Sequence, residues 1–297
     1  MIIDVHRHMW SAKERYREGE FANVPGRESP LPVRFNWEET TQEIVAEMDE
    51  AGVDMTVLLV ADFAARRGDA PFDIHEENRF IVEARKKYPD RLIAFYGIDP
   101  RRLGALDSFE RAIKEWRVQG LKIHNSVGFF PHDRVCYPFY ELCVLHDLPV
   151  LFHVAPNFNP RLYNRYCHPL EFDEVGTDFP NLRIIMGHAG GDWWADCIVV
   201  ARGHPNMVLD LSGWPMKLRD TPAEAVYVLN RMRDGVGIER ILWANDFPGP
   251  RSQISLKECK EIIQRLPSLG AEQGYSFSDA DAQAILGVNA QSLLKLG

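Results

Sequence analysis

Short, continuously apolar runs recur along the chain and alternate with longer stretches in which apolar residues return every three or four positions. Runs such as TVLLV, PVLFHV and RIIMGHA are apolar at successive positions, which is typical of parallel strands buried on both faces. Eight strands are predicted in this way: Ile2–His6, Met55–Val60, Leu92–Gly97, Gly120–His124, Val150–His153, Leu182–Gly187, Met207–Leu211 and Arg240–Ala244.

The stretches between these strands have helical periodicity and end near Gly, Pro or Asp, as helices commonly do. Examples are WEETTQEIVAEMDEAG, HEENRFIVEARKKYPD, ALDSFERAIKEWRVQG, VCYPFYELCVLHDL and TPAEAVYVLNRMRD. Eight strands that alternate with helices predict an α/β protein with the (β/α)8 TIM-barrel fold. An open doubly wound sheet is the alternative, but no glycine-rich fingerprint follows the first strand.

The chain shows no repeat, low-complexity segment or linker, so we expect a single domain over residues 1–297. Its tail, SDADAQAILGVNAQSLLKLG, predicts one or two closing helices. A long segment without clear periodicity, Met9 to Asn36, separates the first strand from the first helix. Loops of this length are usually functional or disordered. In a barrel this loop would lie on the C-terminal face, as a lid or partner contact or as a passive surface excursion.

Composition narrows the class of protein. Hydrophobic residues make up 45% and charged residues 26% of the chain, as in globular proteins. The net charge of −9 argues against binding to nucleic acid. No apolar run approaches the roughly 18 residues that cross a bilayer, and MIIDVHRHMW lacks the basic start of a signal peptide. The five cysteines form no CxxC pair, so we expect reduced thiols and a cytoplasmic protein.

Candidate metal ligands concentrate at the C-terminal ends of the predicted strands. His6 and His8 stand at the end of the first strand, His153 ends the fifth, and His188 follows the sixth in IIMGHAGG. Asp246 follows the eighth strand in RILWANDFPG. Strand side chains alternate between faces, so His6 and His8 point to the same side. Because the C-terminal ends of barrel strands share one face, we expect all five side chains to converge there.

This residue set suits a catalytic divalent metal. Zinc takes nitrogen and oxygen ligands and keeps one position open for water, whose pKa it lowers from 15.7 toward ~7. A carboxylate beside that water can accept its proton. Each residue also has a plainer interpretation on its own, because strand-end histidines often only form hydrogen bonds and Asp246 could cap the following helix. Their joint placement on one face favours a single metal site.

The order of these motifs resembles the amidohydrolase superfamily. More narrowly, it resembles the amidohydrolase-related group of aminocarboxymuconate-semialdehyde decarboxylase, γ-resorcylate decarboxylase and small lactone hydrolases. IIDVHRHMW resembles the opening D-x-H-x-H segment, and VQGLKIHNSVGFFPHDRVCYPFYELCVLHDLPVLFHVA resembles the block from G-x-K-x-H to L-P-V-x-x-H. IIMGHAGG, NMVLDLSG, RILWANDFP and ILGVNAQSLLKL follow in the same order, so the resemblance spans nearly the whole chain.

The resemblance implies that His6, His8, His153 and Asp246 hold one divalent metal, most often zinc, with manganese as an alternative. It implies that His188 acts as an acid or base or polarises a carbonyl beside the metal, and that it could also approach the metal. Asp246 is then both a ligand and the catalytic proton acceptor. Homodimers are common in this group, so we expect one here.

Lys122 corresponds to the lysine of strand four, which is carbamylated and bridges two metals in dinuclear members of the superfamily. Because the group resembled here is usually mononuclear, we interpret Lys122 as an electropositive wall or an anchor for a substrate carboxylate. His124 shares a strand face with Lys122 and either lines the pocket or has a structural role. Trp10 and Arg251 complete the predicted substrate-binding set.

Arginines in the predicted face loops favour an anionic or carbonyl-bearing small molecule, because guanidinium groups bind carboxylates through two hydrogen bonds. These arginines are Arg66, Arg67, Arg161, Arg165 and Arg251. Some of the aromatic residues after the strands are expected to lie in the core, and others could form an apolar rim for an aromatic or cyclic substrate. They are Trp10, Phe129, Phe130, Trp193, Trp194, Trp214 and Phe247.

The first functional hypothesis is a metal-dependent hydrolase of a small ester, lactone or amide-like substrate. Activated water attacks the carbonyl, Asp246 accepts the proton, and His188 with the metal stabilises the oxyanion. The alternative is a non-oxidative decarboxylase of an aromatic or unsaturated carboxylic acid, which would use the same ligands. A hypothesis of another class is a non-catalytic, metal-free barrel that binds a small molecule. The sequence identifies neither the substrate nor the metal.

Overall fold

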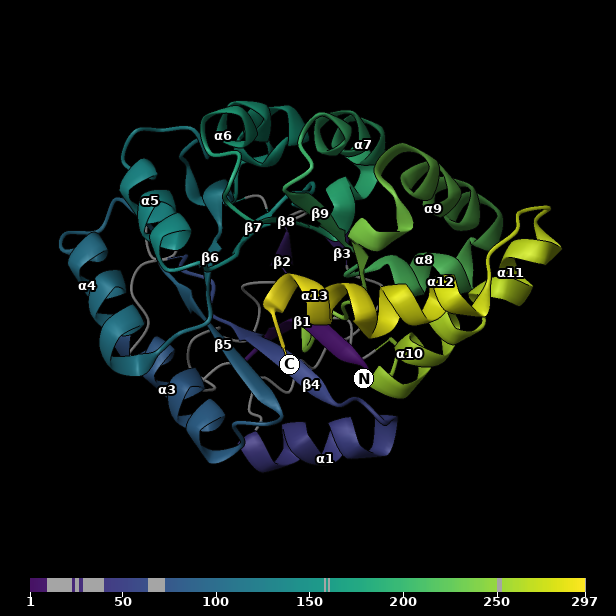
Figure 1. Cartoon of the computed structure of the whole chain (residues 1–297), viewed down its shortest axis with the longest axis horizontal. Helices are drawn as coiled ribbons and strands as arrows, with labels where there is room; N and C mark the ends of the chain where they lie inside the picture. Colours follow the sequence, from purple (N-terminus) through teal and green to yellow (C-terminus); the bar gives the residue numbers. More distant parts are fainter. Residues whose placement is uncertain are drawn as a thin grey trace.

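Eight parallel strands form one sheet whose order follows the chain, β1-β4-β5-β6-β7-β8-β9-β10, and helices surround it (Figure 1). The computed structural model describes residues 1–9, 23–24, 27–28, 40–63, 73–157, 159, 161–249 and 253–296. The strands are β1 (Ile3–His8), β4 (Met55–Leu59), β5 (Leu92–Gly97), β6 (Gly120–Ile123), β7 (Val150–His153), β8 (Ile184–Gly187), β9 (Met207–Asp210) and β10 (Ile241–Leu242).

The barrel closes where the segment after β10 meets β1. Arg7 forms an isolated parallel bridge with Phe247, and His8 N–H donates to the Phe247 carbonyl at 2.7 Å. Asp246 N–H donates to the His6 carbonyl at 2.8 Å. The last element of the barrel is therefore joined to the first at the histidines of the opening motif.

Helices pack around the strands, and four of the described helices, α1, α3, α10 and α12, begin at a residue whose side chain caps the helix. Thr40 and Glu43 form a capping box at α1, and Asp73 and Glu76 form one at α3. The helices are α1 (Thr41–Ala51), α3 (Ile74–Lys87), α4 (Ala105–Arg111), α5 (Tyr137–Leu145), α6 (Asp173–Asp178), α7 (Trp194–Gly203), α8 (Trp214–Asp220), α9 (Pro222–Val236), α10 (Leu256–Gln264), α11 (Leu266–Glu272), α12 (Asp279–Gln283) and α13 (Asn289–Leu294).

Two apolar clusters make up the core. The larger lies between the strands and the surrounding helices. The smaller fills the barrel with inward-facing side chains such as Val5, Val57 and Phe95, and it includes Ala290 of α13. Helix α13 contacts β1 and β10 and covers the barrel in the view of Figure 1. The predicted closing helices thus seal the end opposite the C-terminal face, where the candidate site lies.

The predicted barrel is confirmed, and each of the eight predicted strands corresponds to an observed one. β1 extends to His8 instead of ending at His6, and β10 spans only Ile241–Leu242. The shorter β10 reflects the turn of the chain toward β1, since Asp246 has a left-handed backbone (φ 60°). Of the long segment from Met9 to Asn36, the structure describes only Met9 and two antiparallel pairs of residues, β2 (Asn23–Val24) and β3 (Arg27–Glu28). Its role as a lid therefore stays a prediction.

Candidate metal centre

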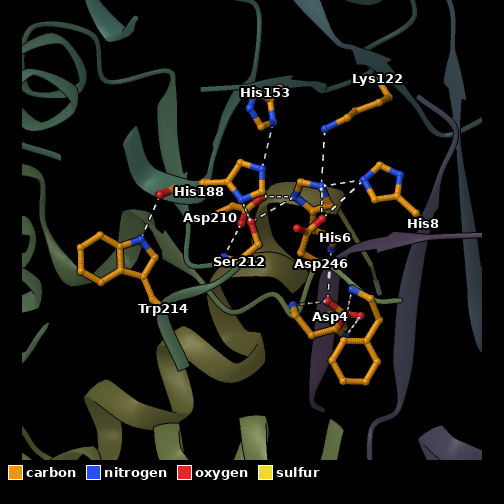
Figure 2. A network of polar contacts seen from close by, with 12 residues as sticks. Asp4, His6, His8, Lys122, His153, His188, Asp210, Ser212, Trp214 and Asp246 are labelled. Carbon is orange, nitrogen blue, oxygen red and sulfur yellow. Dashed lines mark hydrogen bonds and ion pairs between the residues drawn. The ribbon is translucent and has the colours of Figure 1, made fainter. Parts of the chain in front are cut away.

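The two histidines of the opening motif point to the same side of β1, as predicted, and meet Asp246 (Figure 2). The Nε2 atoms of His6 and His8 lie 3.3 Å apart. Asp246 Oδ1 lies 3.4 Å from His6 Nε2 and 3.5 Å from His8 Nε2. Three potential ligand atoms from opposite ends of the chain therefore face one another within a few ångströms.

Asp246 is positioned by a buried contact between β1 and the segment after β10. Asp4 is fully buried and accepts hydrogen bonds from the Asn245 backbone and side-chain amides. The Asn245 side-chain oxygen in turn accepts from the Phe247 backbone N–H. Asp246 stands between these two anchored neighbours with a left-handed backbone, a conformation that Asp tolerates better than most residues. Its side chain remains 30% exposed and so is open to a ligand.

His188 lies in a turn whose backbone is left-handed over four successive residues, from His188 to Gly191. Such a run is strained for side-chain-bearing residues and is typical of functional sites. A Cβ at Gly187 would lie 2.4 Å from the Phe152 carbonyl oxygen, so only glycine permits the close approach of this turn to β7. Trp214 donates its indole N–H to the His188 carbonyl at 2.9 Å, which holds the turn from the other side.

His153 contacts His188 more closely than it contacts the opening motif. Its Nδ1 lies 3.0 Å from His188 Nε2, and its ring stacks on that of His124 with centroids 4.3 Å apart. The Nε2 atom of His153 is buried and has no hydrogen-bond partner among the described residues. Buried side-chain nitrogens almost always form a hydrogen bond, so a buried imidazole nitrogen without one is unusual.

Lys122 reaches the same cluster from β6, as its strand position predicts. It is only 1% exposed, and its Nζ lies 3.5 Å from His6 Nε2 (Figure 2). Burial lowers the pKa of this ammonium, while the negative charges of Asp210 and Asp246 oppose that shift. His124 also lies within the cluster, where its Nδ1 contacts Ser126 Oγ at 2.6 Å.

Electrostatics make the imidazoles good ligands for a cation. Burial is the main cause that lowers the pKa values of His6, His8 and His153 well below the ordinary histidine value, and it lowers that of His188 to about 4. At neutral pH these rings are therefore uncharged and carry lone pairs. Burial also raises the pKa of Asp246, while the nearby Lys122 lowers it.

The donor set fits a divalent metal. Ligand atoms of His6, His188 and Asp246 lie within 4.8 Å of one another, and His8 Nε2 is close to two of these residues. Neutral imidazoles and one carboxylate suit zinc and other transition metals. His6 Nδ1 contacts Asp210 Oδ2 at 2.6 Å, the carboxylate–histidine arrangement that often supports a metal ligand. His153 Nδ1, which faces His188 Nε2, is the nitrogen through which His153 would join this set.

The predicted site residues divide into three sets. His6, His8, Lys122 and Asp246 come together, and His153, His188 and His124 adjoin them. Trp10 and Arg251, together with Arg66 and Arg67, lie outside the described residues. Two of the aromatic residues that follow strands belong to the core, as expected for some of them. Phe247 is fully buried beneath the Arg7 guanidinium, and Trp214 is buried because it supports His188.

Sequence reasoning did not find Asp210, Ser212, Asp4 or Asn245 as contributors to the site. Asp210 and Ser212 stand in NMVLDLSG at the end of the seventh predicted strand, the same kind of position that singled out the histidines. Asp4 lies two residues before His6, and Asn245 lies one residue before Asp246. A search for polar residues of every type at strand ends, instead of histidines alone, would have identified Asp210.

Comparison with known proteins identifies the class of protein. A family model described as amidohydrolase matches residues 3–296, and the chain therefore belongs to the amidohydrolase family. This confirms the predicted resemblance and the expectation of an enzyme of this superfamily.

Among curated proteins, the chain is 26% identical over 227 residues to the 2-keto-4-carboxy-3-hexenedioate hydratase of a Sphingobium species. The match covers 64% of this chain and 66% of that relative, slightly under two thirds of its length.

Several solved structures share the fold. The 5-carboxyvanillate decarboxylase of Sphingomonas paucimobilis has a TM-score of 0.70 at 17% identity and covers 100% of this chain and 99% of its own. A dihydroxybenzoic acid decarboxylase of a Polaromonas species, with bound manganese and 2-nitroresorcinol, has a TM-score of 0.70 at 20% identity, covering 99% and 97%. A probable 2-pyrone-4,6-dicarboxylic acid hydrolase of Acinetobacter baumannii has a TM-score of 0.66 at 14% identity, covering 99% of each chain. Among the described residues, no helix has the length and apolarity needed to cross a membrane.

Proposed function

We propose that the chain is a metal-dependent hydrolase of a small, carboxylate-bearing ester, lactone or amide-like substrate. The observation that carries this proposal is the position of Asp246. Its Oδ1 lies 3.4 and 3.5 Å from two neutral imidazole nitrogens, and its side chain remains partly open. A carboxylate whose pKa is raised by burial, next to a metal site, suits a proton acceptor for an attacking water.

His6, His8, His153 and Asp246 would hold one divalent metal, as the family resemblance implies. When bound, that metal would polarise the substrate carbonyl and lower the pKa of a bound water. Zinc and manganese both suit imidazole and carboxylate ligands, and bound manganese occurs in three solved structures of the same fold. We propose zinc first, with manganese as the alternative.

The remaining groups of the cluster would bind and orient the substrate. The buried Lys122 ammonium would pair with a substrate carboxylate, because the polar side chain that it contacts within the described part of the chain is the uncharged His6 ring. His188 would donate a hydrogen bond to the developing oxyanion. His124, together with Trp10 and Arg251, would line the pocket.

The names of the similar proteins support an acidic substrate. Carboxyvanillate, dihydroxybenzoic acid, pyrone dicarboxylic acid and ketocarboxyhexenedioate are all unsaturated or aromatic carboxylic acids. A buried lysine is a suitable counter-ion for such a molecule, since an ammonium in a site of low polarity is stabilised by a partner of opposite charge. We also expect a homodimer located in the cytoplasm, from the family resemblance and the reduced cysteines.

Decarboxylation is the second candidate. The observation that favours it is again Lys122, which would hold the substrate carboxylate inside the cluster, next to His188 as a proton donor to carbon. The decarboxylases among the similar structures support this alternative. The two reactions differ in product, since hydrolysis releases an acid and decarboxylation releases carbon dioxide.

The test begins with elemental analysis of purified protein and of metal-free protein reconstituted with zinc or manganese. Each form is then assayed on a panel of carboxylated lactones, hydroxybenzoates and unsaturated dicarboxylic acids, with proton release and carbon dioxide release measured separately. We expect stoichiometric metal and proton release from a lactone. Carbon dioxide release would favour the decarboxylase, and addition of water to a double bond would indicate the reaction named for the relative. Protein that takes up no metal would support the binding-barrel hypothesis.

Asp246→Asn tests the role of the carboxylate. This variant keeps an oxygen ligand but removes the base, so we expect kcat to fall by roughly 10²–10⁴-fold. Metal content should stay near the wild-type value. Glu110→Gln, the same chemical change at an exposed helix position, is the matched control. Unchanged turnover in Asp246→Asn would contradict the proposed mechanism.

A further inference from the structure

Asp210 and Ser212 are buried polar residues at the end of β9 that the proposed mechanism does not yet use. Both touch the imidazoles of the site from the side away from Asp246 (Figure 2). We propose that they are positioning residues that set opposite tautomers, with His6 protonated on Nδ1 and His188 protonated on Nε2. His6 is thereby made a metal ligand and His188 a proton donor. The consequence for turnover rests on the proposed function, whereas the tautomers themselves do not.

The tautomer of His6 follows from Asp210. Asp210 Oδ2 lies 2.6 Å from His6 Nδ1, and both side chains are fully buried. An ionised carboxylate offers only acceptors, so the proton between them is on His6 Nδ1. Asp210 is itself held in place, because its Oδ1 accepts from the Ser212 backbone N–H at 2.6 Å. The lone pair of His6 is therefore on Nε2, the atom that faces His8 and Asp246.

The tautomer of His188 follows from the single proton of the Ser212 hydroxyl. Within the described chain, Ser212 Oγ has two side-chain contacts, His188 Nδ1 at 2.8 Å and His6 Nδ1 at 3.3 Å. His6 Nδ1 already bears a proton that it donates to Asp210, so it cannot accept the hydroxyl proton. Ser212 therefore donates to His188 Nδ1, and the proton of the neutral His188 ring is on Nε2.

The neighbouring contacts agree with this assignment. His188 Nε2 lies 3.0 Å from His153 Nδ1, which can accept a hydrogen bond from it. The opposite tautomer would place the His188 proton on Nδ1, directed at Ser212. The Ser212 proton would then have no acceptor among the described residues, a costly arrangement for a buried hydroxyl. Trp214 holds the His188 backbone through its hydrogen bond to the His188 carbonyl.

This assignment gives His6 and His188 different roles, metal ligand and proton donor, which their distances alone do not distinguish. His6, His188 and Asp246 form one compact group of potential ligands. A ring protonated on Nε2 has no lone pair there for a metal, but it can donate that proton or a hydrogen bond to a substrate oxygen. His188 is thus assigned to the substrate side of the site.

Nuclear magnetic resonance of histidine labelled with ¹⁵N tests the proposal directly, because long-range ¹H–¹⁵N correlations distinguish the two neutral tautomers. The spectra are recorded on metal-free and zinc-loaded protein, and His6 and His188 are assigned with His6→Gln and His188→Gln. We expect the Nδ1–H pattern for His6 and the Nε2–H pattern for His188 in both forms. A wild-type His188 protonated on Nδ1 would overturn the proposal without any variant.

Substitutions then separate the two positioning residues. In Ser212→Ala, we expect His188 to lose its pure Nε2–H pattern, and in Ser212→Thr, which keeps the hydroxyl, we expect the pattern to return. In Asp210→Asn, we expect zinc affinity, measured by chelator competition, to fall about 10–100-fold, as for other lost partners of metal-bound histidines. Ser212→Ala should change zinc affinity less than about 3-fold, since it does not support a ligand. Equal losses of zinc affinity in the two variants would contradict the division of roles.

The outcome is independent of turnover. If the tautomers and zinc affinities are as expected but no substrate is converted, the proposed function fails and the assignment of Asp210 and Ser212 stands. If the enzyme turns over substrate while His188 is protonated on Nδ1, the assignment fails and the function stands.

Discussion

Lys122 shows at the scale of a single residue how this site departs from what stability alone would favour. Its side chain is almost completely buried, and among the described residues it contacts an uncharged histidine ring and forms no close ion pair. Burial lowers its pKa, and the carboxylates of Asp210 and Asp246 only partly offset that effect. A buried charge with so little compensation is costly, which suggests a functional reason for the residue.

Lys122→Met should therefore raise stability while it lowers activity. A lysine whose pKa falls on folding binds fewer protons in the folded than in the unfolded state. Its unfavourable contribution is then full below the folded pKa and disappears as the pH rises through the ordinary lysine value of about 10.4. We expect the gain in melting temperature to be largest near pH 7 and to shrink toward pH 10.

Calorimetry across this pH range checks the stability of Lys122→Met, and kcat/KM for a carboxylated substrate checks its activity. We expect kcat/KM to fall at least about 10-fold, as for loss of a charged hydrogen-bond partner. Lys114→Met, at an exposed lysine, is the control and should change neither quantity. A Lys122→Met protein that is less stable at pH 7 would show that the ammonium is structurally required.

At the scale of elements, the site depends on one contact that joins the two ends of the barrel. Asp4 of β1 holds Asn245 through two hydrogen bonds, and the next residue, Asp246, returns its backbone N–H to His6. The candidate ligands on β1 and after β10 are thereby held in a fixed relation. The same contact stabilises barrel closure, because β10 itself pairs with β9 over only two residues.

Asn245→Ala should destabilise the barrel and weaken metal binding together. The substitution removes the Asn245 side-chain donor from the fully buried Asp4 carboxyl group and leaves only the longer contact of Thr56 Oγ1, at 3.5 Å, to Asp4 Oδ2 among the described side chains. An unsatisfied buried group typically costs about 1–3 kcal/mol, more when charged. Urea denaturation measures the free energy of unfolding, and chelator competition measures metal affinity. Asn206→Ala is a useful comparison, because Asn206 also bonds to backbone but lies at the start of β9, away from the ligands. It should lower stability and leave metal affinity unchanged.

The strands and helices could be predicted from the sequence, but the side-chain contacts between them could not. Buried parallel strands are continuously apolar, so the pattern located all eight, and strand ends in a barrel share a face, so His6, His8, His188 and Asp246 could be placed together. The pattern carries no information on which polar residue contacts which imidazole. Asp210 and Ser212 therefore escaped notice, and the place of His153 beside His188 instead of His6 depends on a turn that needs close backbone approach at Gly187.

At the scale of the whole molecule, the last helix, α13, covers one end of the barrel. Ala290 of α13 is fully buried and packs with the inward-facing residues of the strands. Ala290→Asp should therefore cost several kcal/mol or prevent folding, because it places a charge in an apolar interior. Ser292→Asp, on the exposed side of the same helix, should leave the melting temperature within a few degrees. Thermal unfolding of the two variants checks this prediction, and equal melting temperatures would mean that α13 does not seal the core.

Metal removal tests how much metal binding contributes to the stability of the barrel. The proposed ligands come from β1, from the end of β7 and from the segment after β10, so a bound metal would connect parts of the chain that separate on unfolding. A ligand that binds only the folded state stabilises it by about 2.7 kcal/mol at a concentration 100 times its dissociation constant. For a domain of this size, that corresponds to a melting temperature roughly 4 °C higher than in metal-free protein. Differential scanning calorimetry before and after chelation, and again after zinc is restored, measures the shift.

His6→Ala should show little shift, because it loses the Nε2 atom that faces both His8 and Asp246. A wild-type protein whose melting temperature is the same with and without zinc would mean that zinc does not bind the folded chain in preference to the unfolded one, which would contradict the proposed centre.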